Sequence, residues 1–166
     1  MQLDGEPHMP VSNFERMIAL AEEFFEMKDD PDQLDIDENI IAQLHTIHPS
    51  TMGEVSDENG PIAWTIVIPT TNHIMQRFLE KTISEKELLE LTLKESAFES
   101  LYLCSALVLP EHRGKGLAKD LVMESVRTIQ NDHPITSLFY WGFSSEGEHL
   151  ARKIGSITGL TLYQRV

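Results

Sequence analysis

The chain of 166 residues is poor in cysteine and in basic side chains. Cys104 is its only cysteine, which excludes an internal disulfide and makes a reducing cytoplasm the expected compartment. Lysine and arginine number 13 against 27 acidic residues, so the formal net charge is −14. Nucleic-acid binding through phosphate neutralisation needs a basic face, and we expect no such partner. An acidic surface would instead attract cationic substrates such as amines, or it could serve solubility alone.

Long apolar runs are also missing. No run approaches the ~20 apolar residues of a membrane-spanning helix. Residues 1–10 do not join a basic segment to an apolar one, as a secretory signal does. We therefore expect a cytoplasmic protein with no membrane partner. The length and the hydrophobic content of 41% suit a single domain, residues 1–166, with a buried core.

Residues 101–118 form the most informative stretch, Leu-Tyr-Leu-Cys-Ser-Ala-Leu-Val-Leu-Pro-Glu-His-Arg-Gly-Lys-Gly-Leu-Ala. The first half is a nearly continuous apolar run, which is typical of a strand covered on both faces. Pro110 ends the strand because it has no amide hydrogen for pairing. From Leu117 to Ile129, apolar residues recur at helical spacing. A glycine-bearing loop thus joins a buried strand to the start of a helix.

Such a loop suits a phosphate group. The start of a helix exposes unpaired amide hydrogens and the positive end of the helix dipole, and glycine lets a phosphate approach closely. Arg113, Lys115 and Lys119 add positive charge in a strongly acidic chain. The alternative is an ordinary strand-to-helix turn in which the glycines only relieve backbone strain.

Residues 113–118, Arg-Gly-Lys-Gly-Leu-Ala, fit the (Gln/Arg)-x-x-Gly-x-(Gly/Ala) signature, and the stretch thereby resembles the GNAT superfamily of N-acetyltransferases. The resemblance is specific over residues 101–126 and loose elsewhere from residue 51 onward. It implies an α/β (α+β) fold with a mixed, mostly antiparallel central sheet, helices on both faces, and a splay between the fourth and fifth strands. It also implies transfer of an acetyl group from acetyl-CoA to an amine by direct attack in a ternary complex.

The order of predicted elements favours a mixed sheet with helices on its faces. Capping patterns and apolar spacing predict helices over residues 12–25, 35–47, 117–129 and 144–154. β-rich runs predict strands over residues 51–57, 62–68, 101–109, 136–143 and 160–163. A solvated turn of aspartates is predicted at residues 29–32. The first strand that is customary in the family is not evident before Ser12.

Residues 70–97 depart from the family pattern, because many relatives pass almost directly from the third strand to the fourth. Two short helices are predicted here, and a capping box at residues 84–87 begins the second. We therefore predict a helical insertion. It could be a lid over the acceptor pocket, a packing element or an oligomer contact.

His45 and His48 lie on one face near the end of the second predicted helix. A metal site would need a third ligand, which the sequence does not clearly supply, so we expect no metal. Both histidines suit surface or capping roles, and a place beside the acceptor is the alternative.

The resemblance assigns a cofactor site to backbone groups more than to side chains. Residues 114–119 would bind the pyrophosphate of acetyl-CoA through amide hydrogens, and residues 106–108 would present backbone groups to its pantetheine arm. The predicted cofactor-binding residues are Ala106, Leu107, Val108, Arg113, Gly114, Lys115, Gly116, Leu117, Ala118 and Lys119.

The catalytic pattern of the family is incomplete in this chain. Tyr102 stands where several relatives have a glutamate on the fourth strand, and no carboxylate is expected on that face because Glu99 points to the opposite side. Phe139 occupies the other glutamate position, on the fifth strand. Ser144 replaces an asparagine near the end of that strand, and Ala151 replaces the tyrosine proposed as the acid.

Tyr102 and Ser144 are therefore the predicted catalytic residues. Tyr102, with or without a water, would help to deprotonate or orient the amine, unless it is only a wall residue. Ser144 can donate and accept a hydrogen bond, and the thiolate would leave with the help of solvent. Cys104 invites a covalent route, but a buried strand cysteine is usually inert packing.

The leading functional hypothesis is an N-acetyltransferase that acts on a primary amine of a small molecule or a protein. One alternative keeps acetyl-CoA binding without efficient catalysis, as a regulatory or interaction module of the same fold. In another alternative the protein does not bind CoA, and the glycine-bearing loop has only a structural role. A homodimer is compatible with the resemblance because many relatives dimerise.

Overall fold

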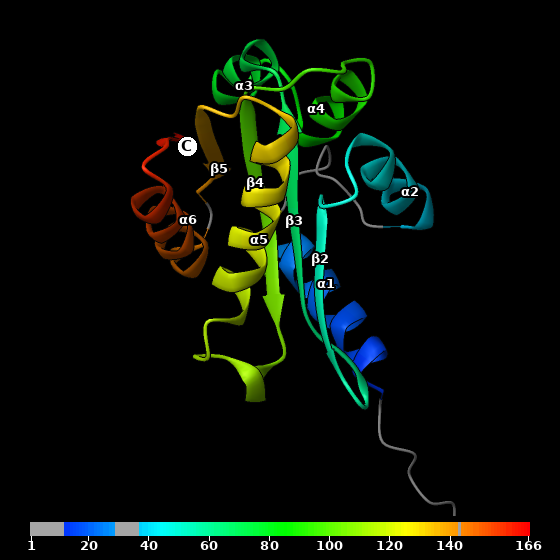
Figure 1. Cartoon of the computed structure of the whole chain (residues 1–166). Coiled ribbons are helices and arrows are strands. Elements are labelled where there is room, and N and C mark those ends of the chain that lie inside the picture. The colour runs from blue at the N-terminus through cyan, green and yellow to red at the C-terminus, as the bar shows by residue number, and fades with distance from the viewer. Residues whose placement is uncertain (1–11, 29–36, 143) are drawn as a thin grey trace, which may run out of the picture.

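Figure 1 shows a computed structural model that describes residues 12–28, 37–142 and 144–166. Its helices are α1 (Asn13–Lys28), α2 (Glu38–Ile47), α3 (Asn72–Leu79), α4 (Glu85–Thr92), the short 3₁₀ turn η1 (Pro110–His112), α5 (Leu117–Asp132) and α6 (Ser145–Thr158). Its strands are β2 (Met52–Asp57), β3 (Gly60–Thr70), β4 (Ser100–Val108), β5 (Ser137–Trp141) and β6 (Thr161–Arg165). The predicted aspartate turn and the segment before Ser12 lie outside the described residues.

The five strands form one sheet in the order β2-β3-β4-β5-β6. β2 pairs with β3 and β3 with β4 in antiparallel fashion, and these are the longest pairings. β4 pairs with β5 and β5 with β6 in parallel fashion. The predicted mixed sheet, in which the antiparallel ladders dominate, is confirmed.

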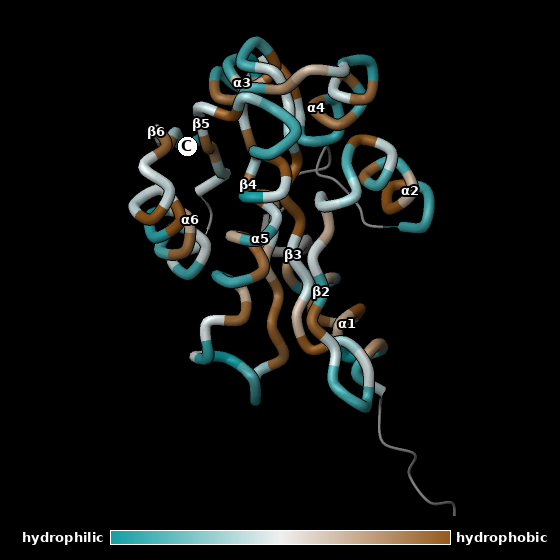
Figure 2. The backbone as a smooth tube through the Cα atoms, viewed as in Figure 1, coloured by the Kyte–Doolittle hydropathy of each residue, from teal (hydrophilic) through white to brown (hydrophobic). Residues whose placement is uncertain are grey.

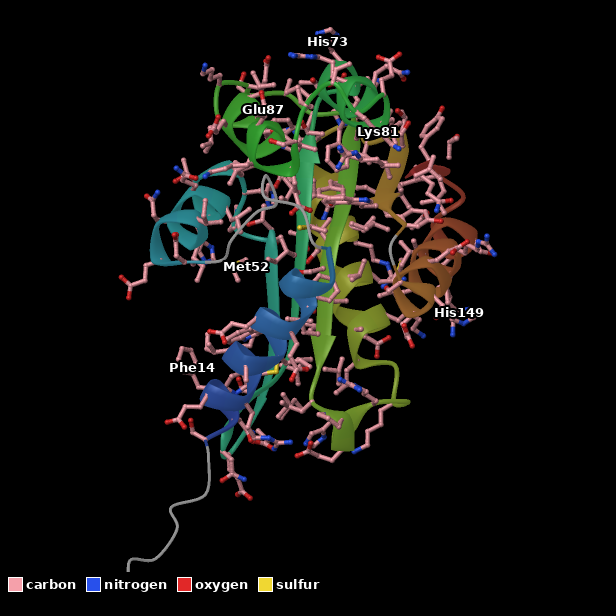
Figure 3. The ribbon with its side chains drawn as sticks, turned by 180° about the vertical axis from the view of Figure 1, so that it is seen from behind. Phe14, Met52, His73, Lys81, Glu87 and His149 are labelled. Atoms are coloured by element: carbon pink, nitrogen blue, oxygen red, sulfur yellow. The ribbon has the colours of Figure 1, made fainter. Side chains whose placement is uncertain are left out.

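Helices cover both faces of this sheet. α5 crosses the face that is turned to the viewer in Figure 1, and α1 crosses the opposite face, which is seen in Figure 3. Figure 2 shows that the central strands are the most hydrophobic part of the chain, as burial on both faces requires. No helix within the described ranges is both long and apolar enough to cross a membrane.

Alternation along β4 distributes its side chains between two cores. Leu101 and Leu103 face α5 and pack with Val122, Val126 and Ile129. Tyr102 and Cys104 face the other side. There they meet apolar side chains from α2, α3 and α4, which include Leu44, Ile74, Met75, Phe78, Leu88 and Leu89.

Both helices that were predicted within residues 70–97 are present. The side chain of Thr71 caps α3, and the predicted capping box begins α4, since Ser84 and Glu87 each accept a hydrogen bond from the other's backbone amide. Their apolar faces are buried against the sheet. Of the three roles considered for the insertion, the structure shows packing.

Candidate functional site

The candidate site lies where β4 and β5 separate. The two strands pair from Ser100 and Ser137 as far as Leu103 and Tyr140, whereas β4 itself continues to Val108. The predicted splay between these strands is confirmed. A cavity of about 670 Å³ occupies the region, and it is lined by residues of β4, β5, α1, α5 and α6.

A β-bulge marks the point of separation. β3 pairs Val67 with Leu103 and Ile66 with Ser105, so that Cys104 falls in the register shift between them. A bulge bends its strand and redirects the side chains that follow it. Beyond it, residues 104–108 line the cavity, and the described chain offers no β5 partner to this edge of β4.

Nine of the ten predicted cofactor-binding residues meet at this cavity, so the strand and the loop share one site. They are Ala106, Leu107, Val108, Arg113, Gly114, Gly116, Leu117, Ala118 and Lys119. Lys115 is exposed and is not part of the lining. The role of these residues in binding stays a prediction.

The start of α5 opens onto the cavity. Gly116 is its N-cap, with a left-handed φ of 79°, and no side chain of the described residues caps the helix. The first amide hydrogens of a helix lack intrahelical acceptors and carry the positive end of its dipole. Arg113 donates its Nε–H to the carbonyl oxygen of Val108 at 3.0 Å, which holds the loop against the end of β4. This first turn therefore offers backbone donors to an anion in the cavity.

A bidentate ion pair joins the same loop to α1. Arg16 donates to both carboxylate oxygens of Glu111, in η1, at 2.7 and 2.6 Å. The guanidinium lowers the pKa of Glu111 from 4.5 to about 2. Leu20, Glu23 and Phe24, further along α1, line the cavity. The pair thus connects two walls of the site.

Replacing Arg16 with alanine is expected to return the pKa of Glu111 towards its ordinary value, because the main cause of the depression is removed. A depressed carboxyl pKa stabilises the folded state above the unfolded pKa, and this contribution is lost as the pH falls from about 4.5 to about 2. NMR titration of the glutamate side chains measures the pKa, and denaturant unfolding at pH values between about 2 and 5 measures the stability. Arg152→Ala, which removes the partner of Glu148 on α6, is the control. An ordinary Glu111 pKa in the parent protein would contradict this expectation.

Ser144 lies on the cavity wall at the start of α6. Its Oγ accepts the backbone N–H of Gly147 at 3.1 Å, and its own hydroxyl hydrogen remains available for donation. Ala151, about two turns into α6, is buried and also lines the cavity. Ser144 can therefore donate a hydrogen bond to a ligand in the cavity, whereas Ala151 cannot.

Tyr102 lies behind the cavity and is not part of its lining. The side chain is fully buried, stacks on Phe139 at 5.0 Å, and donates its hydroxyl hydrogen to Oε2 of Glu85 at 2.5 Å. Burial, followed by the negative charge of Glu85, raises the pKa of Tyr102 well above its usual value of 10. The phenol therefore keeps its proton and cannot serve as the base.

The expectation that no carboxylate faces Tyr102 is wrong. Glu85, in the first turn of α4, reaches that face from the insertion and is 1% exposed. Its Oε2 accepts from Tyr102 and also from the Cys104 thiol at 3.8 Å. Strand alternation ruled out carboxylates of β4 itself, but it carries no information about a helix that packs from elsewhere.

Arg165 is a second buried charge that the sequence did not reveal. It lies at the end of β6, and its guanidinium carbon is 4.4 Å from the ring centre of Phe78 and 4.5 Å from that of Trp141. Its charge opposes that of Glu85 at Tyr102 and works to lower the tyrosine pKa. Aromatic faces attract such a cation.

His48 has the capping role that was one of its predicted alternatives. It follows α2, its amide donates to the carbonyl of Leu44, and its ring accepts the N–H of Ser50 at Nδ1. Nε2 therefore carries the hydrogen and donates to Asp132 at 2.7 Å. Neither His48 nor His45 lines the cavity, and no cluster suited to a metal ion occurs among residues 12–28, 37–142 and 144–166.

No protein-family model matches the sequence, and no curated protein matches it either. Among solved structures, the chain is similar to a ribosomal-protein-alanine N-acetyltransferase from Brucella melitensis biovar Abortus 2308. The TM-score is 0.46 and the sequence identity is 12%, over 83% of this chain and 80% of the other.

Proposed function

We propose that the protein is an acetyl-CoA-dependent N-acetyltransferase of the GNAT type. One observation carries the proposal: the uncapped start of α5 and the edge of β4 that is released from β5 line the same cavity. A helix start binds phosphate groups, and an unpaired strand edge binds amides. Acetyl-CoA presents both, since a pyrophosphate is followed by an arm with two amide groups.

In this proposal the amide hydrogens of residues 114–119 hold the pyrophosphate, with positive charge from Arg113 and Lys119. Residues 106–108 pair with the pantetheine arm and bring the thioester towards the bulge at Cys104. A primary amine then attacks the carbonyl carbon, and the carbon–sulfur bond breaks as the thiolate leaves. Ser144 donates a hydrogen bond to the departing sulfur, and the proton that the nitrogen loses as the amide forms passes through solvent to the thiolate. Tyr102 does not contact the substrate in this proposal, and its hydroxyl keeps the buried carboxylate of Glu85 in position through a hydrogen bond.

A second candidate function is acetyl-CoA binding without efficient transfer, as a regulatory or interaction module. The specific observation in its favour is Ala151, which lines the cavity at the position where relatives carry a proton donor. Binding would depend on the same loop and the same strand edge. The two functions differ only in turnover.

Titration of the purified chain with acetyl-CoA tests the proposal. A ligand that binds only the folded state stabilises it by about 2.7 kcal/mol at one hundred times its Kd, so we expect a saturable thermal shift. We then expect free thiol to appear when amines are added, across polyamines, aminoglycosides and lysine peptides. Binding without thiol release from any amine supports the regulatory module. The absence of a thermal shift contradicts both functions and favours a structural loop.

A further inference from the structure

A buried carboxylate lies one side chain away from the cavity. Cys104 is part of the cavity wall, and its Sγ is 3.8 Å from Oε2 of Glu85. Glu85 itself is not part of the lining. A residue of the cavity wall thus donates its thiol hydrogen to a buried carboxylate, at the bulge where β4 leaves β5.

The start of α4 holds this carboxylate in place. The capping box of Ser84 and Glu87 fixes the first turn, and the positive end of the helix dipole lies next to Glu85. At the other end of α4, the hydroxyl of Thr92 is 2.7 Å from that of Thr70 on β3. A helix fixed at both ends gives the carboxylate a defined position relative to β4.

The carboxylate of Glu85 accepts hydrogen bonds from two side chains. Tyr102 and Cys104, both on β4, donate to Oε2, and the permanent positive charge of Arg165, on β6, acts on Tyr102. Among the described residues, the rings of Phe78, in α3, and Phe139, in β5, pack against Tyr102. The phenol keeps its proton, whereas a carboxylate is by its chemistry able to accept one.

We propose that Glu85 receives the proton that the acceptor ammonium must lose before attack, with the Cys104 thiol as the relay. The ammonium N–H bond breaks as a new S–H bond forms, and the original thiol hydrogen passes to Oε2 of Glu85. An ammonium and a carboxylate become an amine and a carboxylic acid, and nothing is oxidised or reduced. The freed lone pair of the amine then attacks the thioester. The inference rests on the proposed acetyl transfer. It gives the helical insertion, residues 70–97, a role in catalysis, because Glu85 belongs to α4.

The test compares initial rates of thiol release between pH 6 and 10 for the parent chain and for Glu85→Gln. Loss of a general base costs on the order of 100-fold or more. We expect that loss near pH 7 in Glu85→Gln, followed by a rise of about tenfold per pH unit towards the amine pKa of ~10.4, where the amine needs no base. Lost packing alone would not be repaired by alkali, so this profile separates the relay from a structural defect.

Three further variants complete the experiment. Cys104→Ala should show the same pH profile as Glu85→Gln, and Cys104→Ser should restore part of the lost rate because a hydroxyl can also pass a proton. Glu90→Gln, an exposed site on the same helix, should leave the profile unchanged. If Glu85→Gln does not fold, Cys104→Ala carries the test.

The outcomes separate this inference from the function on which it rests. Thiol release by the parent chain, combined with parental pH profiles in Glu85→Gln or Cys104→Ala, overturns the relay and leaves the acetyl transfer standing. A parent chain that binds acetyl-CoA but releases no thiol overturns both. Retained acetyl-CoA affinity in the two variants shows that the cofactor loop is intact.

Discussion

Replacement of Phe78 with alanine is expected to lower the free energy of unfolding by about 3–5 kcal/mol, the usual cost of removing a buried phenylalanine ring. Phe78 is fully buried in α3. Its ring centre is 5.0 Å from that of Tyr102, 5.9 Å from that of Phe139 and 6.2 Å from that of Trp141. The substitution would remove the centre of an aromatic cluster and leave a cavity that rigid neighbours cannot fill.

Denaturant unfolding of both proteins measures this change. Phe14→Ala makes the same chemical change at a side chain that is 56% exposed, and about 1 kcal/mol or less is expected there. A loss below about 1 kcal/mol for Phe78→Ala would show that α3 adds little to the core. Hydrogen exchange at the amides of α4 shows whether the loss is global or confined to residues 70–97.

The strand, loop and helix around residues 101–118 were predictable because their signals are local. An apolar run predicts β4, Pro110 ends it, and the spacing of leucines and valines predicts α5. Each signal acts within a few residues of the structure that it determines. The splay next to β4 came from the family resemblance, since no property of β4 alone shows where β5 stops.

The role of the insertion was not predictable in the same way. Apolar residues predicted α3 and the capping box at residues 84–87 predicted α4, and both helices are present. The face of the sheet on which the helices pack depends on contacts across the fold. Glu85 illustrates this: it is an ordinary first-turn glutamate in the sequence, and only the packing of α4 brings it to Tyr102.

Tyr102 shows the limit of alternation along a strand. The pattern of β4 places Tyr102 and Cys104 on the same face, and both side chains do lie there. The alternation does not show how many residues of that face are covered by the helices of the insertion. The ring of Phe78 lies against Tyr102 and the tyrosine is fully buried, whereas Cys104, two residues further along, reaches the cavity wall. Both residues are buried, but a shift of two residues along the strand separates one that lies behind the cavity from one in its wall.

The second large effect is expected at Gly116. Its φ of 79° lies in the left-handed region, which a β-branched residue adopts only at a cost of about 1–3 kcal/mol. A Cβ atom added at Gly116 would meet no protein atom within 4 Å, so it would project into open space beside the first turn of α5. If a pyrophosphate binds there, Gly116→Val both blocks its approach and disturbs the amide donors. We expect the affinity for acetyl-CoA to fall on the order of 100-fold.

Gly159→Val is the matched control for this substitution. Gly159 follows α6 with a φ of 73°, it also has no atom within 4 Å of an added Cβ, and it does not line the cavity. The backbone strain is therefore comparable, whereas the distance from the proposed pyrophosphate site differs. Both variants should be less stable than the parent chain, but only Gly116→Val should bind acetyl-CoA more weakly.

The size of the thermal shift makes this comparison decisive. With acetyl-CoA at one hundred times the parental Kd, binding stabilises the parent chain by about 2.7 kcal/mol, and a 100-fold weaker variant retains only about 0.4 kcal/mol. The ligand-induced shift should therefore nearly vanish in Gly116→Val and persist in Gly159→Val, whatever each substitution costs the free protein. Equal shifts in the two variants would mean that the start of α5 does not bind the pyrophosphate. In that case the glycine serves only the backbone of an ordinary strand-to-helix turn.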